Sequence, residues 1–278
     1  MNSLIKSIIF PFAVIIIIIP SMVFAERELP VSNSNLLPHS SFYSLSMGTS
    51  KNSESFVDVK GIVRANLERT CEGWITSERI KMQVSLQSNR QWKQELIYTG
   101  WESNDGTKYR FATRSSNNGK TVKYRGIANS NENLPGKAIY SQPKKVVMIL
   151  PPGTHFYYGL TAWLIKKARS GVRRAETTVF DGTDLDGPQQ VTSFIIPIKA
   201  KDVLDKKMNS ILGPLIERPG WKMHIAFYAS GGRKAEPEYE VRAIILDNGI
   251  IPKLDLVFDT FTAVQTLEKI ELIKAPNC

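Results

Sequence analysis

Apolar and polar residues alternate with a period of two along most of the chain from Ser40 onward. Because successive side chains of a β-strand point to opposite faces, this period predicts strands with one apolar face and one polar face rich in Lys, Arg, Glu and Ser. The clearest apolar series are Val57, Val59, Val63, Ala65 and Leu67; Ile80, Met82, Val84 and Leu86; Tyr109 and Phe111; Trp221, Met223, Ile225 and Phe227; Tyr239, Val241, Ala243 and Ile245; and Leu254, Leu256 and Phe258.

Three glycine turns separate neighbouring series. They are "NDG" at Asn104–Gly106, "NNG" at Asn117–Gly119 and "DNG" at Asp247–Gly249. Such turns supply the positive φ angles of tight hairpins, so the pattern predicts an antiparallel meander of about a dozen short strands. A sheet of that length rolls up or buries its edges. We therefore expect a mainly all-β fold, one long antiparallel sheet curled into a barrel or spiral, with one or two helices.

Two segments break the alternation. Pro151–Ser170 has apolar residues at helical spacing and basic residues in its last turn, so it predicts a helix with Thr154 as its N-cap and Gly171 as its stop. This helix would plug the interior of the rolled sheet or cover one of its edges. Lys199–Gly213 predicts a second, shorter helix.

The N-terminus has the pattern of a secretory signal peptide. Lys6 precedes an apolar run from Ile8 to Ile19, and small residues lead up to a predicted cleavage between Ala25 and Glu26. The alternative is an uncleaved membrane anchor, but the run is shorter than the ~20 residues that span a bilayer. We expect residues 1–25 to be removed on export, residues 26–39 to form a flexible leader and residues 40–278 to form one β domain in the periplasm.

The chain contains two cysteines, Cys71 and Cys278, which more than two hundred residues separate. Disulfides persist in oxidising compartments, so export predicts a bridge between them, which the chain-entropy relation values at about 5 kcal/mol. A buried free thiol at Cys71 and an intermolecular dimer are the alternatives. The bridge would pin the last strand to an early one and close the domain.

The chain is basic, with a net charge of +10 that falls to +9 when Lys6 is removed with the signal peptide. A basic surface favours acidic partners such as anionic lipid headgroups, anionic polysaccharide or an acidic protein. Many exported proteins are basic without a specific ligand, which is the simpler explanation. Export makes nucleic acid an unsuitable partner.

Motifs of the common enzyme classes are absent from the sequence, including G-x-S-x-G, H-E-x-x-H, G-x-G-x-x-G and the phosphate-binding loop. The weak candidates are the three histidines His39, His155 and His224, the S-x-x-K of Ser141–Lys144, and the acidic "DGTDLDG" of Asp181–Gly187. Each has a simpler explanation in packing or in a polar turn. We expect no enzyme activity, no metal site and no cofactor. The five tryptophans leave a second class open, a rolled sheet that carries lipid or lipoprotein in an apolar concavity.

Several segments together resemble the EipB family of exported cell-envelope-integrity proteins of Gram-negative bacteria. They are "CEGW" (Cys71–Trp74), "GWESNDGTKYRFATRS" (Gly100–Ser115), "LPPGTHFYYGLTAWLIKKARSGVRRAETTVFDGTD" (Leu150–Asp184) and the terminal Cys278. The resemblance extends from about Pro38 to Cys278. It implies a long antiparallel sheet wound into an open spiral or broken barrel, a structural disulfide between the two cysteines, and a role in envelope stress resistance.

The same resemblance implies periplasmic protein partners, among them helical-repeat proteins of the TPR type, and it carries over no catalytic residue. The chain departs from the family pattern in two places. "HFYYG" at the start of the predicted helix lacks a proline, and Lys199–Pro219 matches poorly. The role of residues 199–219 and the identity of a partner therefore do not transfer.

Overall fold

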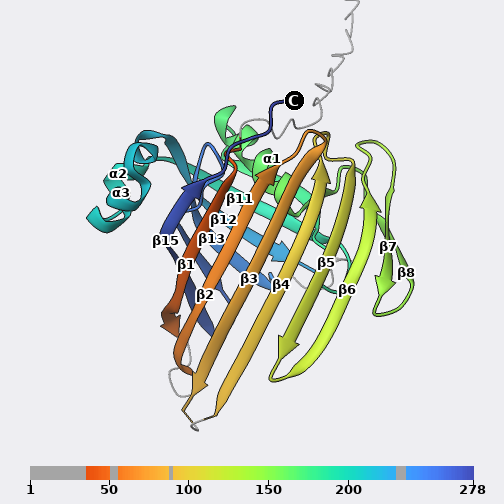
Figure 1. The fold of residues 1–278 in the computed structure, drawn as a ribbon, viewed down its shortest axis with the longest axis horizontal. Coiled ribbons are helices and arrows are strands. Elements are labelled where there is room, and N and C mark those ends of the chain that lie inside the picture. The colour runs from red at the N-terminus through yellow and green to blue at the C-terminus, as the bar shows by residue number, and fades with distance from the viewer. Residues whose placement is uncertain (1–35, 51–55, 88–89, 230–235) are drawn as a thin grey trace, which may run out of the picture.

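The strands in the described part of the chain form one 15-stranded sheet (Figure 1). The computed structural model describes residues 36–50, 56–87, 90–229 and 236–278. The first eight strands are β1 (His39–Ser50), β2 (Phe56–Arg69), β3 (Gly73–Leu86), β4 (Gln91–Ser103), β5 (Lys108–Asn117), β6 (Lys120–Asn129), β7 (Gly136–Gln142) and β8 (Val146–Leu150). The others are β9 (His155–Phe156), β10 (Arg174–Phe180), β11 (Gln189–Lys199), β12 (Pro219–Tyr228), β13 (Tyr239–Leu246), β14 (Lys253–Val257) and β15 (Phe261–Leu272).

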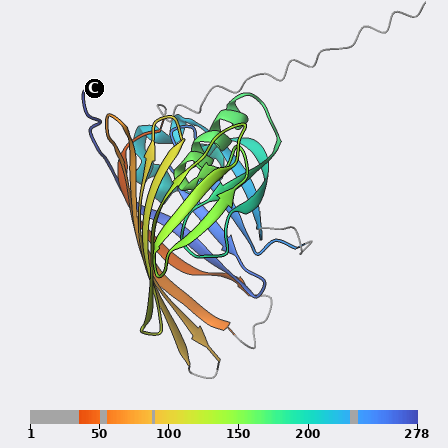
Figure 2. The same ribbon diagram turned by 90° about the vertical axis from the view of Figure 1, so that its right-hand side faces the viewer.

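The order of strands in the sheet follows the order in the chain except at one junction. From β1 the sheet runs through β2 to β8 on one side, and through β15 back to β9 on the other. The first and last strands therefore pair at the centre, with Tyr43 opposite Leu267. The two edges, β8 and β9, are neighbours in sequence but are not paired with each other. The sheet rolls up without closing (Figure 2), which confirms the predicted fold class.

The period-two pattern explains which face of each strand is buried. Val63 and Leu67 of β2, and Met223 and Ile225 of β12, are 2–5% exposed, while the residues between them are more exposed. All three predicted glycine turns join neighbouring strands, as at Gly249, where φ is +85°. Every strand pair is antiparallel except the short parallel pair β9–β10, which helix α1 connects.

Helix α1 (Tyr157–Arg169) lies at one end of the roll, between the strands β1–β6 and the strands β11–β13 (Figures 1 and 2). Its residues Trp163, Leu164 and Ala168 are buried against Val191, Ile225 and other residues of β10–β13. The prediction of an N-cap at Thr154 was wrong. The cap position is Phe156, which contributes no side-chain hydrogen bond, and the Thr154 hydroxyl instead donates to the carbonyl of Pro151 at 2.7 Å.

The second predicted helix is interrupted. α2 (Ala200–Val203) and α3 (Lys206–Leu212) are separated by Leu204 and Asp205, and a 3-10 helix η2 (Gly213–Glu217) follows. The break has a local cause, because the Asp205 carboxylate accepts the N–H of Met208 at 2.8 Å and so starts a new helix. Among the helices of the described residues, none combines the length and apolar character that a bilayer-spanning helix requires.

The predicted signal peptide, its cleavage site at Ala25 and Glu26, and residues 26–35 of the predicted leader lie outside the described residues. The rest of that leader is packed. Leu36 is buried, Leu37 donates its N–H to the carbonyl of Asn248 at 2.9 Å, and β1 already begins at His39. The β domain therefore extends a few residues further toward the N-terminus than the predicted boundary at residue 40.

Aromatic side chains, and not strand pairing, join the two halves of the rolled sheet at the seam between β8 and β9. The ring of Tyr109 on β5 stacks on Phe156 with centroids 4.7 Å apart, and Phe111 meets Phe180 edge-on at 5.6 Å. The hydroxyl of Tyr109 donates to the carbonyl of Asp181 at 2.7 Å. The seam cluster comprises Tyr98, Tyr109, Phe111, Ala128, Ala138, Tyr140, Leu150, Phe156 and Phe180.

Candidate functional site

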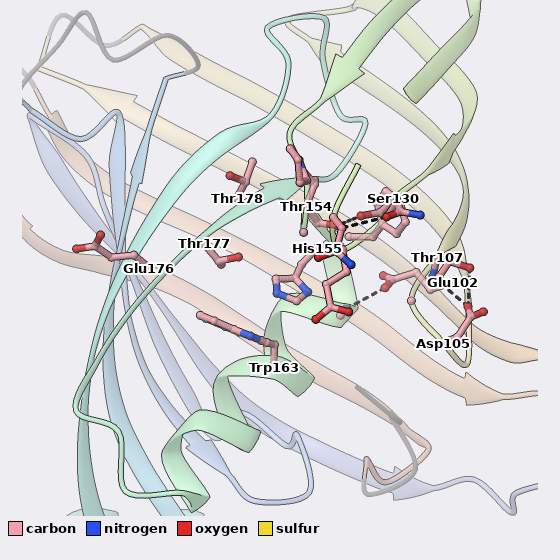
Figure 3. A pocket seen from close by; sticks show the side chains of 18 of the residues that line it. Glu102, Asp105, Thr107, Ser130, Thr154, His155, Trp163, Glu176, Thr177 and Thr178 are labelled. Carbon is pink, nitrogen blue, oxygen red and sulfur yellow. Dashed lines mark hydrogen bonds between the residues drawn. The ribbon is translucent and has the colours of Figure 1, made fainter. Parts of the chain in front are cut away.

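A pocket of about 700 Å³ opens beside the N-terminus of α1, next to the seam (Figure 3). Its walls come from both halves of the sheet. The first half contributes the end of β4, the β4–β5 turn and residues 130–133, while the second contributes residues 152–156, α1, β10 and Gln190 of β11. A pocket where the two halves meet without strand pairing is a natural place for a ligand, because such sites favour the junctions of structural units.

The carboxylate of Glu102, at the end of β4, holds the N-terminus of α1. One oxygen accepts the N–H of Tyr158 at 2.5 Å and the other accepts the N–H of Gly159 at 2.9 Å. A side chain at position 159 would crowd this contact, since a Cβ there would lie 3.1 Å from Glu102 Oε2. The first N–H groups of a helix have no partner within the helix and attract negative charge, so Glu102 supplies the cap that the local sequence lacks.

Burial sets the protonation of Glu102. Its side chain is only 3% exposed, and loss of hydration raises the pKa of its carboxyl to about 7, although the two backbone hydrogen bonds act in the opposite direction. The carboxyl is therefore partly protonated near neutral pH.

The other end of α1 is tied to the second half of the sheet. The guanidinium of Arg169 donates to the carbonyl of Asp247 at 3.0 Å, and the Asp247 carboxylate also accepts from Arg218. Asp247 is 8% exposed and lies in the turn that follows β13. Helix α1 is thus held at its start by the first half of the sheet and at its end by the second.

An aromatic pair forms one side of the pocket. The rings of His155 and Trp163 lie 5.1 Å apart, and the two side chains face each other in Figure 3. The ammonium group of Lys167 also lies over the Trp163 ring, 5.3 Å from its centroid. Trp163 is only 6% exposed, so it contributes packing rather than an open stacking platform.

The polar groups at the rim of the pocket bind one another. The Asp105 carboxylate accepts the Ser103 hydroxyl at 2.5 Å and the N–H of Thr107 at 3.0 Å. Burial opposes ionisation of Asp105, but these hydrogen bonds outweigh it and keep the pKa of the carboxyl below its usual value. The Ser130 hydroxyl donates to the carbonyl of Thr154 at 2.6 Å.

The pocket is acidic although the protein is basic. Its lining includes four carboxylates and no lysine or arginine; the carboxylates belong to Glu102, Asp105, Glu132 and Glu176. Within the ranges that the structure describes, no group of three or more histidine, cysteine or acidic side chains is arranged to hold a metal ion.

The disulfide lies next to this site. Cys71 and Cys278 are bonded, with Cα atoms 5.6 Å apart. The carbonyl of Cys71 accepts the side-chain amide of Asn104 at 2.8 Å, and the N–H of Asn104 donates to the carbonyl of Glu72 at 3.0 Å. Asn104 follows Glu102 closely in the chain, so the bridge, the β4–β5 turn and the start of α1 form one connected region.

Comparison with known protein families matches residues 30–274 to the family described as EipB-like. This chain belongs to the EipB-like family. A curated relative, the Cell envelope integrity protein EipB of Brucella abortus (strain 2308), is 25% identical over 254 residues, which cover 90% of this chain and 89% of the relative.

The fold is shared as well. A crystal structure of a beta-barrel-like protein from Brucella abortus, described as a domain of unknown function, matches with a TM-score of 0.77 at 23% identity. The match covers 86% of this chain and 99% of that one. The EipB-like resemblance in the sequence is therefore confirmed, and so is the fold that it implies.

The weak catalytic candidates of this EipB-like chain are not brought together. His39 contacts the carbonyl of Leu37 at 2.7 Å, His224 contacts Glu240 at 2.9 Å on the β12–β13 pair, and His155 faces Trp163. Ser141 lies near the end of β7, where its hydroxyl donates to the carbonyl of Arg125 at 3.2 Å.

The acidic loop Asp181–Gly187 has a structural task in the EipB-like fold. Its backbone carbonyls receive the hydroxyls of two seam tyrosines, Tyr109 at Asp181 and Tyr140 at Asp184. The Asp181 carboxylate accepts the N–H of Thr183 at 2.9 Å, within the loop. The loop covers the aromatic seam, which agrees with the explanation of this motif as a polar turn.

Sequence analysis missed Glu102, the residue that organises the pocket. A signal was present, because Tyr98, Gly100 and Glu102 share one face of β4 and Tyr98 is fully buried on it. An acid on the apolar face of a strand needs a partner that compensates its burial. The sequence does not contain the identity of that partner, which lies more than fifty residues further along the chain.

Proposed function

We propose that this EipB-like protein supports the integrity of the cell envelope as a non-enzymatic periplasmic protein that binds other proteins. The first support is the relative that matches over 90% of the chain, which is named as a cell envelope integrity protein. The second is the predicted signal peptide, which would deliver the chain to the oxidising compartment where a Cys71–Cys278 disulfide persists.

One observation carries the choice of binding over catalysis. Both oxygens of the most buried pocket carboxylate, Glu102, accept backbone N–H groups of α1. A general base or nucleophile must reach its substrate with a free lone pair in hydrogen-bonding distance. Glu102 binds the helix, Asp105 binds Ser103 and Thr107, and Ser130 binds a backbone carbonyl, so these groups are directed at the protein itself, and this favours a structural role for them over catalysis.

The packing of α1 favours protein binding over the lipid-carrier alternative. A carrier of an acyl chain needs a free apolar interior, and α1 instead packs Trp163, Leu164 and Ala168 against the inner side of β10–β13. The partners that we propose are periplasmic proteins, with helical-repeat proteins as first candidates.

A deletion strain tests the role and the compartment. We expect loss of the gene to raise sensitivity to detergents and to cell-wall antibiotics, and the full chain to restore resistance. A version without residues 2–25 serves as the matched control, and we expect it to fail because it stays in the cytoplasm. A deletion strain with normal sensitivity to these agents would refute the proposal.

Native mass spectrometry of the protein purified from the periplasm tests the carrier alternative. We expect the bare mass of the mature chain with one disulfide. Additional mass that disappears on denaturation would replace our proposal with a carrier function.

A further inference from the structure

The outer face of β3–β8 carries a continuous line of six residues, one on each strand, and all of them except Arg110 are apolar. Each residue of the line lies directly opposite the next one in the strand pairing: Ile75, Trp101, Arg110, Ile127, Ile139 and Val147. Opposite residues of paired strands point to the same face, so the line is one surface feature about 24 Å long, given roughly 4.8 Å between strands. We call Ile75, Trp101, Ile127, Ile139, Val147 and the adjacent Ile149 the apolar row.

The apolar row is open to solvent at its β8 end. Ile127 is 55% exposed, Val147 is 53% exposed and Ile149 is 62% exposed. The middle of the row is hollowed by a pocket of about 650 Å³, whose lining includes Ile75, Trp101 and Ile139. Exposed apolar patches that polar groups surround are typical of interaction sites.

Positive charge surrounds the row. Residues 108–150, which span β5–β8, contain nine lysines and arginines and one acid, Glu132. Their excess of +8 compares with +10 for the whole chain. No salt bridge among the described residues involves any of these nine cations. Two of them, Arg110 and Arg125, are the charged residues that line the hollow. Arg110 lies over the Trp101 ring at 5.0 Å.

The apolar row ends at a strand edge that accepts another strand. In the sheet of described residues, β8 is the last strand on its side and pairs with β7 alone. It consists of five apolar residues, "VVMIL", without the proline or internal charge that usually protects an edge. Its backbone therefore offers unpaired N–H and C=O groups directly beside Val147 and Ile149.

We propose that β8 and the apolar row form the docking site for an extended, acidic segment of a partner protein. The segment adds a strand to β8, places its apolar side chains on Val147, Ile149 and the hollow, and sets its carboxylates against Arg110, Arg125 and Lys137. Strand addition supplies main-chain hydrogen bonds for affinity and alternate side chains for specificity. This inference rests on the proposed function, since it names the surface and the chemistry of the partner.

The same observations disfavour two other occupants. A lipid surface would bury the β8 edge without pairing its backbone groups, which costs several kcal/mol for each unpaired group in hydrocarbon. If a second copy of this chain bound at this face, residues 108–150 of the two copies, each with a net charge of +8, would come together. Like charges in contact oppose association. An acidic protein segment satisfies both the backbone and the charge.

A synthetic peptide tests this site. The probe is a fluorescent ten-residue peptide of alternating valine and glutamate, titrated with the mature, disulfide-bonded protein and followed by anisotropy. Two control peptides carry lysine in place of glutamate, or backbone N-methyl groups at every second residue. We expect binding of the probe and at least about tenfold weaker binding of both controls, because one loses the charge match and the other the strand pairing.

Two double variants locate the binding. In Lys137→Glu/Ile149→Ser, both changed residues form one exposed cross-strand pair at the site. In Ile196→Ser/Lys222→Glu, the same two residue types form an exposed cross-strand pair on β11–β12, and Ile196 is 60% exposed against 62% for Ile149. We expect the first variant to weaken probe binding at least about tenfold and the second less than about twofold. Melting curves check that both fold.

Several results would overturn the inference. They are no binding of the probe, equal binding of the N-methylated peptide, or equal loss in both double variants. Sedimentation with phosphatidylglycerol vesicles that depends on Lys137 and Ile149, without peptide binding, would assign the surface to a membrane.

The deletion strain separates this inference from the proposed function. If the parent gene does not restore resistance, the proposed function fails whatever the peptide does. If Lys137→Glu/Ile149→Ser loses peptide binding but restores resistance fully, the docking site fails as part of that function while the envelope role stands. We expect that variant to restore resistance poorly and Ile196→Ser/Lys222→Glu to restore it well.

Discussion

The N–H of Gly159 donates to the carboxylate of Glu102 at 2.9 Å, across 57 positions of the chain. This hydrogen bond joins the strand half β1–β8 to the helix that connects β9 and β10 in the other half of the sheet. Because the edges β8 and β9 are not paired with each other, contacts of this kind, together with the aromatic seam, hold the roll together. The buried carboxyl therefore has consequences for stability.

We expect the stability of the protein to fall as pH rises through the range where Glu102 ionises. Burial raises the folded pKa of Glu102 to about 7, above the ordinary value of 4.5 for a glutamate side chain. The folded state thus binds more protons than the unfolded state between these values, and the free energy of unfolding decreases with rising pH. In Glu102→Gln, which cannot ionise, the stability advantage of the parent should shrink by roughly 2–3 kcal/mol from pH 5 to pH 8.

Urea unfolding of both proteins at the two pH values measures this difference. Other buried acids contribute equally to both proteins, so they cancel. Parallel pH dependences of parent and variant would show that Glu102 is not the titrating group.

Cys278→Ser should lower the melting temperature in oxidising buffer. In the chain-entropy relation, the loss of a bridge that closes more than two hundred residues costs up to about 5 kcal/mol. In reductant, parent and variant should melt together, and Cys71→Ser should behave like Cys278→Ser. An intact mass two hydrogens below the reduced value checks the bridge in the parent, and equal melting under both conditions would contradict it.

Gly182→Ala should weaken the aromatic seam. A Cβ at Gly182 would lie 2.4 Å from Phe111 Cδ2, and the positive φ of +72° adds strain. Gly171→Ala is the matched control, since φ is +84° there but no atom lies within 4 Å of the added Cβ. We expect about 1 kcal/mol for the control and about 2–4 kcal/mol for Gly182→Ala, measured by chemical denaturation. Equal losses of stability in the two variants would mean that close packing of Gly182 on Phe111 does not contribute to the free energy of unfolding.

Tyr109→Phe should cost about 1–3 kcal/mol, because it removes a buried hydroxyl that donates to the carbonyl of Asp181 and contacts the Tyr98 hydroxyl. Tyr158→Phe is the control. The hydroxyl of Tyr158 is buried without a hydrogen-bond partner, so its removal should be neutral or stabilising. Thermal unfolding of both variants compares them, and a larger loss in Tyr158→Phe would refute this account of the seam.

The strands were predictable because the information that specifies them is local. Val63 and Leu67, or Met223 and Ile225, show period-two burial within a few residues, and the glycine turns join neighbours. The central β1–β15 pair has no such local pattern, since its partners lie at opposite ends of the described chain. Only the two cysteines indicated that an early and a late strand meet.

The N-cap of α1 was predicted two residues too early, at Thr154 in place of Phe156, because the information that specifies it is not local. Thr154 has the chemistry of an N-cap, but the cap comes from Glu102, a neighbour in space and not in sequence. The prediction at Lys199–Gly213 overlooked Asp205, whose cap to Met208 divides the segment into two helices. That signal was local and could have been found.

The apolar row was not recognised in the sequence because its residues are isolated exceptions to the period-two pattern. Ile127 and Ile139 fall on the face that alternation assigns to polar residues, and β8 is apolar on both faces. A single strand does not reveal that these exceptions lie opposite one another. Their alignment depends on the register of five strand pairs, which only the folded sheet defines.

The arrangement of the sheet also determines the order in which its parts can assemble during synthesis. When residue 150 has been made, the strands β1–β8 are complete and every pair among them joins sequence neighbours. The free edge of β1 then waits for β15, which starts at Phe261, more than a hundred residues later. During that interval the β1–β8 meander has an unpaired strand at each side, β1 and β8. Any protein that binds the growing chain must therefore protect both edges until β15 is made.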